Sequence, residues 1–136
     1  MQSIVTFEIL FGLILALVLG AIVGVEREIT HKPAGLRTHM LVSLGSCLFT
    51  LVSVAFAMDP ARIAAGIVTG IGFIGAGTII AAQDRVVGIT TAASLWTTAS
   101  IGLIIGVGDY LLAIVATVLV FLVLFSKAIL KRIGIE

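Results

Sequence analysis

The stretch IVTFEILFGLILALVLGAIVGV, residues 4–25, contains a single charged residue, Glu8, over its whole length. A segment of about 20 apolar residues is long enough to cross the hydrocarbon core of a bilayer as a helix. Comparable apolar runs recur at residues 40–58, 63–82, 92–107 and 110–130. We therefore predict an all-α protein, a polytopic membrane bundle of five transmembrane helices that forms a single domain over residues 1–136.

Composition supports a membrane protein and excludes other classes. Hydrophobic residues make up 60% of the chain and charged residues 11%, which leaves too little polar surface for a soluble domain. The net charge of +1 argues against a nucleic-acid partner. The only cysteine, Cys47, lies inside the second run, and His31 and His39 are not spaced as a metal pair on one helical face. We therefore expect no disulfide within the chain, no metal site and no cofactor.

Basic residues are distributed unevenly among the short segments, here called gaps, that separate the apolar runs. Those on one side of the expected membrane are Arg27, Lys32, Arg37, Arg85, Lys127, Lys131 and Arg132. Only Arg62 falls on the other side. Because basic gaps stay in the cytoplasm, we expect the N-terminus outside and the C-terminus in the cytoplasm.

Glycine recurs at spacings that place a smooth stripe on a helix. In the first run, Gly20 and Gly24 are four residues apart, and the third run contains Gly70, Gly72, Gly75 and Gly77. Close backbone approach is a main route to helix association in lipid, so we expect these glycines to pack helices within one chain or between two copies in a homodimer. The spacing of Gly70, Gly72 and Gly75 also matches a dinucleotide-binding fingerprint, but the strand and soluble βαβ unit that this motif needs are missing from the sequence.

The gap after the first run is the richest in charge. Glu26 and Arg27 end that run and Arg37 precedes the second, so we predict an ion pair between Glu26 and Arg37. Asp84 and Arg85 occupy the next gap on the same side and would join them in a charge network. The alternative is a solvated loop that orients the protein and contacts anionic lipid headgroups.

The fourth run begins with hydroxyl residues at helical spacing. Thr90, Thr91 and Ser94 form its polar end, and Thr97 and Thr98 continue the stripe. A helix N-terminus there could hold an anionic group. The alternative is that these hydroxyls donate hydrogen bonds to neighbouring helices.

Capping residues mark the expected helix ends. Asp59 followed by Pro60 predicts the start of the third helix, and Gly108 followed by Asp109 predicts a stop and a new start. Thr38 is expected to cap the second helix, and Thr90 or Thr91 the fourth.

Four sequence blocks carry a family resemblance. They are GAIVGVERE at residues 20–28, KPAGLRTH at 32–39, GIGFIGAGTI at 70–79 and GITTAASLW at 88–96. In this order they resemble the MgtC/SapB family of bacterial inner-membrane proteins. The resemblance implies a five-helix membrane module linked to magnesium homeostasis, in a family whose members look more like regulators of other membrane machines, such as the proton-translocating ATP synthase, than pumps.

The resemblance also sets an expectation about length. The chain ends at Glu136, soon after the fifth run, so we expect a short form without the C-terminal cytoplasmic domain of the virulence-associated members. A virulence role that depends on that domain is then not implied.

Three functional classes follow from these residues. The first is a modulator that is not an enzyme and acts through contacts with membrane lipids, a second copy or another membrane protein. The second is a small transporter or channel for a cation such as Mg²⁺ or another solute, although no run has an acidic residue near its centre. The third is an enzyme, for which the sequence supplies no group of nucleophile, base and orienting residue. We expect the modulator.

Overall fold

The computed structural model describes residues 6–56, 59–82, 85–132 and 134. Five helices and one short β-hairpin make up this part of the chain. In chain order they are α1 (Phe7–Ile29), α2 (Leu36–Ala55), α3 (Pro60–Ala76), β1 (Ile80–Ala82), β2 (Arg85–Val87), α4 (Ile89–Gly106) and α5 (Tyr110–Arg132).

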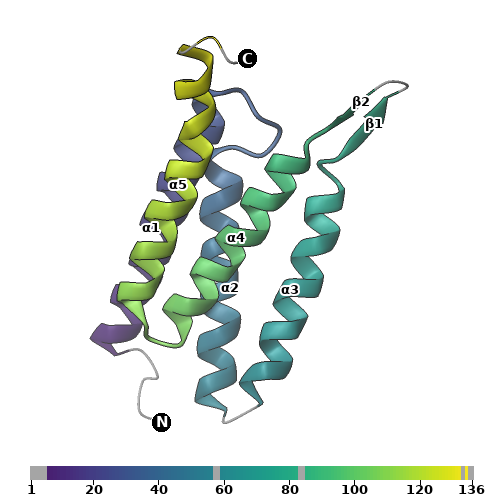
Figure 1. The fold of residues 1–136 in the computed structure, drawn as a ribbon. Coiled ribbons are helices and arrows are strands. Elements are labelled where there is room, and N and C mark those ends of the chain that lie inside the picture. The colour runs from purple at the N-terminus through teal and green to yellow at the C-terminus, as the bar shows by residue number, and fades with distance from the viewer. Residues whose placement is uncertain (1–5, 57–58, 83–84, 133, 135–136) are drawn as a thin grey trace.

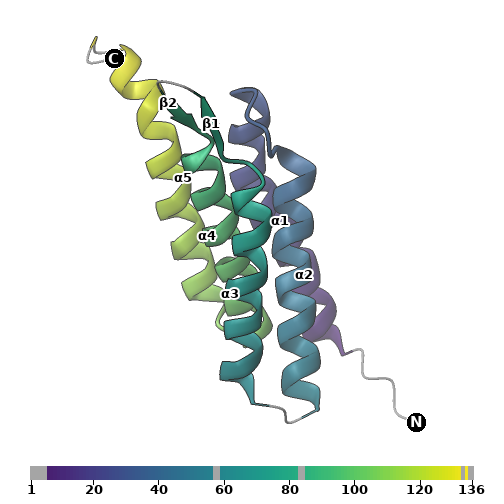
Figure 2. The same ribbon diagram turned by 90° about the vertical axis from the view of Figure 1, so that its right-hand side faces the viewer.

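The helices run alternately up and down, side by side (Figures 1 and 2). The α1–α2 loop, the β-hairpin and the end of α5 lie at one end, which we call the loop end. Helix α2 packs against both α1 and α4, whereas α5 lies against α1 and α4 on the outside. Helix α3 contacts α4 and, less extensively, α2. The site described below therefore lies among α1, α2 and α4.

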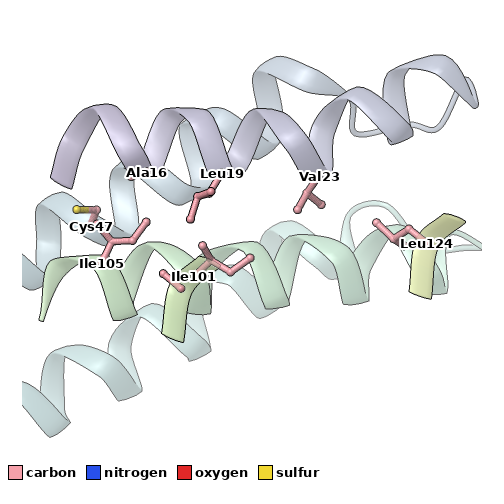
Figure 3. Close-up of a cluster of buried hydrophobic side chains, with 8 residues drawn as sticks. Ala16, Leu19, Val23, Cys47, Ile101, Ile105 and Leu124 are labelled. Carbon is pink, nitrogen blue, oxygen red and sulfur yellow. The ribbon is translucent and has the colours of Figure 1, made fainter. Parts of the chain in front are cut away.

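Apolar side chains from four helices form the main core (Figure 3). Its buried members are Ala16, Leu19, Val23, Cys47, Ile101, Ile105, Ala113 and Leu124. A second, smaller cluster of buried residues holds α3 to α4 around Ile71, Leu95 and Ala99. Most other large apolar side chains face outward, as expected where the surrounding solvent is lipid.

Four helices are long and apolar enough to cross a membrane: α1, α2, α4 and the part of α5 from Tyr110 to Lys127. The apolar part of α3, Ala61–Ala76, is shorter. The predicted third run, residues 63–82, is wrong at its C-terminal end because α3 stops at Ala76.

The hairpin that follows α3 was not predicted. Ile80 pairs with Val87 and Ala82 with Arg85 in an antiparallel register. Glycine is a poor helix former and Gly77 caps α3, while the β-branched residues beyond it favour strands. Gly88 then turns the chain into α4 with a φ of 94°, a value that glycine adopts readily.

Two of the predicted caps are confirmed. Asp59 Oδ1 accepts a hydrogen bond from the Ala61 amide at 3.0 Å, with Pro60 at the first helical position. Asp109 Oδ1 accepts from the Leu112 amide at 3.0 Å, after Gly108 with its φ of 92°.

The two predicted threonine caps are wrong. Helix α2 begins at Leu36, and its first amide donates to Glu28 Oε2, 2.9 Å away, so the cap comes from the end of α1 rather than from Thr38. Helix α4 begins at Ile89 after Gly88, which places Thr90 and Thr91 inside the helix.

Candidate functional site

Glycines bring three helices into backbone contact around α2. A Cβ atom added at Gly20 would lie 2.7 Å from the His39 carbonyl oxygen, and one at Gly24 would lie 2.7 Å from Leu36 Cα. From α4, a Cβ at Gly102 would overlap the Ser43 carbonyl oxygen, and one at Gly106 would lie 2.5 Å from Thr50 Cβ. Helices α1 and α4 therefore approach α2 as closely as their backbones allow.

The predicted glycine packing in α3 is largely not found within the chain. A Cβ at Gly70 or Gly72 would meet nothing within 4 Å. A Cβ added at Gly75 would lie 3.4 Å from Ala92 Cβ of α4, an ordinary contact distance, and the neighbours of Gly77 belong to its own segment. The same residue type at similar spacing is thus closely packed in α1 and open in α3.

A charged pair is buried at the loop end of α1. Glu26 is 9% exposed and Arg27 is 3% exposed, and the Arg27 guanidinium donates a hydrogen bond to the Glu26 carboxylate. Burial of a single charge would be expensive, so each of these groups needs the other.

The predicted pairing of Glu26 with Arg37 is absent from the described part of the chain, because Arg37 is exposed. Arg37 and His39 are two residues apart on α2, and 100° of rotation per residue turns them about 200° apart. His39 faces the bundle, which points Arg37 away from it.

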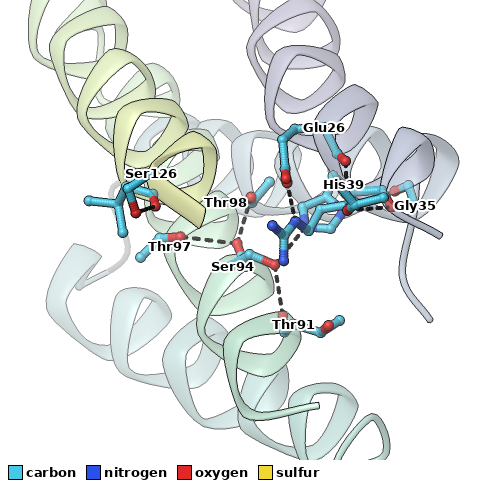
Figure 4. A network of polar contacts seen from close by, with 11 residues as sticks. Glu26, Gly35, His39, Thr91, Ser94, Thr97, Thr98 and Ser126 are labelled. Atoms are coloured by element: carbon cyan, nitrogen blue, oxygen red, sulfur yellow. Dashed lines mark hydrogen bonds and ion pairs between the residues drawn. The ribbon is translucent and has the colours of Figure 1, made fainter. Parts of the chain in front are cut away.

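His39 links α2 to α4 beside this pair (Figure 4). Its side chain is fully buried, with Nδ1 2.9 Å from the Gly35 carbonyl oxygen and Nε2 3.0 Å from Ser94 Oγ. Ser94 Oγ also lies 2.8 Å from the Thr91 carbonyl oxygen. The Glu26–Arg27 pair lies beside the imidazole ring (Figure 4). The charged pair, His39 and Ser94 therefore form one polar cluster that joins three helices.

The hydrogen bonds of His39 find a partner in either protonation state of its ring. The Gly35 carbonyl oxygen only accepts, so Nδ1 of His39 carries a hydrogen. In the neutral ring, Nε2 accepts a hydrogen bond from the Ser94 hydroxyl. In the charged ring, Nε2 donates to Ser94 Oγ, whose hydrogen then turns to the Thr91 carbonyl. In both the neutral and the charged form, the two ring nitrogens of His39 are hydrogen-bonded, and only the Ser94 hydroxyl group has to rotate between them.

A column of buried polar residues continues from His39 along α2. Its further members are Ser43, Ser46, Thr50 and Ser53. Thr50 Oγ1 donates to the Ser46 carbonyl at 2.8 Å, whereas within the described part of the chain Ser43 Oγ and Ser53 Oγ have no hydrogen-bond partner. The sequence interpretation missed this column, although its spacing of three and four residues was visible.

The structure divides the other predicted site residues into two groups. Thr91 and Ser94 are buried against α2, whereas Thr90 and Arg85 are exposed, the latter on β2. Asp84 lies outside the described residues, so its part in the predicted charge network stays a prediction. No group of three or more His, Cys, Asp or Glu side chains that could hold a metal ion occurs among the residues that the structure describes.

Four helices long enough to cross a bilayer, packed up and down around a buried polar cluster, define a multi-pass helical membrane protein. Comparison with known proteins gives the family. The model of the MgtC family matches residues 13–133, and the chain belongs to this family.

Curated relatives agree with the family assignment. The protein named "Putative magnesium transporter YhiD" of Escherichia coli K12 is 48% identical in an alignment 129 residues long, and the match covers 88% of this chain and 60% of the relative. Protein MgtC of Salmonella typhimurium is 42% identical over 120 residues, which cover 88% of this chain and 52% of the relative. The chain thus spans about half to three fifths of the length of these relatives. No solved structure matches it significantly.

Proposed function

We propose that this chain is the membrane module of a protein that supports magnesium homeostasis, and that it acts as a modulator of other membrane machinery rather than as an enzyme. Membership of the MgtC family and the names of the relatives support the link to magnesium. One observation favours a modulator: Glu26, the one buried carboxylate among the described residues, is neutralised by Arg27. Magnesium sites are built on carboxylate oxygens and retained water, and the described bundle interior offers no free carboxylate for this.

The proposal places the chain in the bacterial inner membrane with five crossings. The alternating directions of the helices support five crossings, as does the collection of basic gaps at the loop end. Ala61–Ala76 of α3 is about 24 Å long at 1.5 Å per residue. Local thinning of a bilayer core of about 30 Å would accommodate this shorter helix.

The orientation predicts a pattern of chemical labelling. In a Cys47→Ser background, Lys32→Cys and Arg85→Cys should react only with membrane-permeant thiol reagents, because both positions lie at the loop end, which we place in the cytoplasm. Asp59→Cys should also react with impermeant reagents in intact cells. The opposite pattern would reverse the orientation.

The surface for a partner is proposed at the loop end. Arg37, Arg85 and Thr90 were predicted as site residues and are exposed, so they are free to contact another protein. The buried members Glu26, Arg27, Thr91 and Ser94 hold the helices beneath this surface. A homodimer is also part of the proposal, since a Cβ added at Gly72 would meet nothing within 4 Å among the described residues, which leaves this position of α3 open to a second copy.

A transporter is the second candidate, and the polar column of α2 is the observation that favours it. Ser43 Oγ and Ser53 Oγ are buried without a partner within the described chain, and hydroxyl groups can line a path for water or a hydrated ion. The magnesium transporter name printed for the Escherichia coli relative agrees with this alternative.

Growth and flux measurements distinguish the two candidates. Purified protein in liposomes should show no saturable magnesium flux under a concentration gradient or a membrane potential. Cells that lack the gene should grow worse in low magnesium, and Arg37→Gln and Arg85→Gln should lose most of the rescue at unchanged membrane levels. Lys127→Gln, an exposed basic residue on α5, is the matched control and should rescue fully.

A saturable magnesium flux that Ser43→Val or Ser53→Val abolishes would replace the modulator with the transporter. Full rescue by both arginine variants would remove the proposed partner surface.

A further inference from the structure

A large apolar groove runs between α2 and α3. Its volume is about 680 Å³. Its lining residues are Thr38, Leu41, Val42, Gly45, Ser46, Phe49, Arg62, Ile63, Gly66, Ile67, Gly70, Ile71 and Ile74. Figure 1 shows α3 leaning away from α2 towards the loop end. The separation of these two helices creates the groove.

The floor of the groove is made of bare backbone. Cβ atoms added at Gly45, Gly66 or Gly70 would meet nothing within 4 Å. In α1 and α4, glycines let helices touch, but these three leave an open channel. Such a space in a membrane-spanning protein loses contact energy unless something fills it. The walls are almost entirely aliphatic or aromatic, which suits a hydrocarbon occupant.

A cationic side chain lies at one end of this channel. Arg62, near the start of α3, is exposed and lines the groove. No carboxylate pairs with it in the described ranges of the chain. It is also the single basic residue on its side of the proposed topology. A guanidinium group binds phosphate oxygens well through paired N–H donors.

The length of the channel matches one leaflet. From Arg62 to Ile74, twelve steps along α3 at 1.5 Å each give about 18 Å. Half of a hydrocarbon core of about 30 Å is about 15 Å. An acyl chain that starts from a headgroup at Arg62 would therefore fill the groove towards the loop end.

We propose that the α2–α3 groove binds one phospholipid of the leaflet on the Arg62 side, with its phosphate on Arg62 and one acyl chain over Gly66 and Gly70. A second copy of the chain fits less well. The two helices that form the groove, α2 and α3, contain no acidic residue that could meet Arg62 of a second copy across a twofold interface.

Lipid binding by purified protein tests this assignment. Delipidated protein in mild detergent is titrated with phosphatidylglycerol, and bound lipid is counted by native mass spectrometry. One lipid should bind the wild type, and Arg62→Gln should weaken its binding about tenfold, because a hydrogen bond to a charged group is lost. Gly70→Leu should abolish binding by filling the channel, and it should do so without unfolding the protein, since the added atoms enter open space.

Two matched variants serve as controls. Ala65→Leu adds a leucine side chain at an exposed position of α3 that does not line the groove, and Lys127→Gln removes an exposed cation on α5. Both should bind lipid as the wild type does, and free inorganic phosphate should not compete.

Three results would overturn the assignment. The first is equal lipid binding by Arg62→Gln and the wild type. The second is competition between lipid and inorganic phosphate. The third is that Gly70→Leu changes the oligomeric state of the protein and still binds lipid. The last result would assign the groove to a second copy of the chain.

Discussion

Gly102→Ala should destabilise the bundle by about 3 kcal/mol, the upper part of the range for an overpacked core. The added methyl group would overlap the Ser43 carbonyl oxygen, which is part of the α2 backbone and cannot rotate aside as a side chain would. The two helices must therefore move apart, which also strains the Ser94 contact with His39. Thermal unfolding in detergent, followed by the helical circular dichroism signal, measures the loss.

Gly45→Ala is the control for this substitution. It makes the same change in α2, at a position where the new atom meets nothing within 4 Å. It should stabilise the protein by about 0.5 to 1 kcal/mol, because alanine is a better helix former than glycine and the new atom meets no neighbour. Equal melting temperatures for the two variants would show that α2 and α4 are not packed backbone to backbone.

Glu26→Gln should cost about 3 to 5 kcal/mol, because it leaves the Arg27 charge buried and unpaired. Combined with Arg27→Met, it should recover most of that loss, since the double variant buries no charge. The recovery would appear as a large coupling free energy in a double-mutant cycle measured by thermal unfolding in detergent.

Glu8→Gln is the matched control, because Glu8 lies on the same helix and is exposed. It should have an effect near zero. Additive losses from Glu26→Gln and Arg27→Met would show that the two side chains do not depend on each other.

Length and apolarity predicted four of the helices well, since α1, α2, α4 and α5 overlap the apolar runs. They failed at the end of α3, because hydropathy does not distinguish the apolar residues of a helix from those of strands β1 and β2. The glycine and β-branched content of residues 75–80 contained the missing information.

The charged site shows a different limit. Glu26 was correctly expected to need a partner, but the choice between Arg27 and Arg37 depends on where α2 begins. A helix start at Leu36 turns His39 inward and Arg37 outward, and that start is fixed by Glu28, a residue of the preceding helix. Glycines show the same limit, since Gly20 and Gly70 differ only in which neighbour lies opposite. The sequence shows that a buried charge or a glycine stripe needs a neighbour, but only the fold shows which residue that neighbour is.

The junction between α3, the hairpin and α4 connects the position of α3 to that of the hairpin. The base of the hairpin is clamped, because a Cβ at Gly88 would overlap the Thr78 carbonyl oxygen, and α3 rests on Ala92 of α4 at Gly75. If the proposed partner binds the hairpin at Arg85, that contact would also act on α3 through this junction and on its separation from α2. By thermodynamic reciprocity, whatever occupies that space would then change the affinity of the hairpin for its partner by the same factor. The lipid composition of the bilayer would then change how strongly this protein binds its proposed partner.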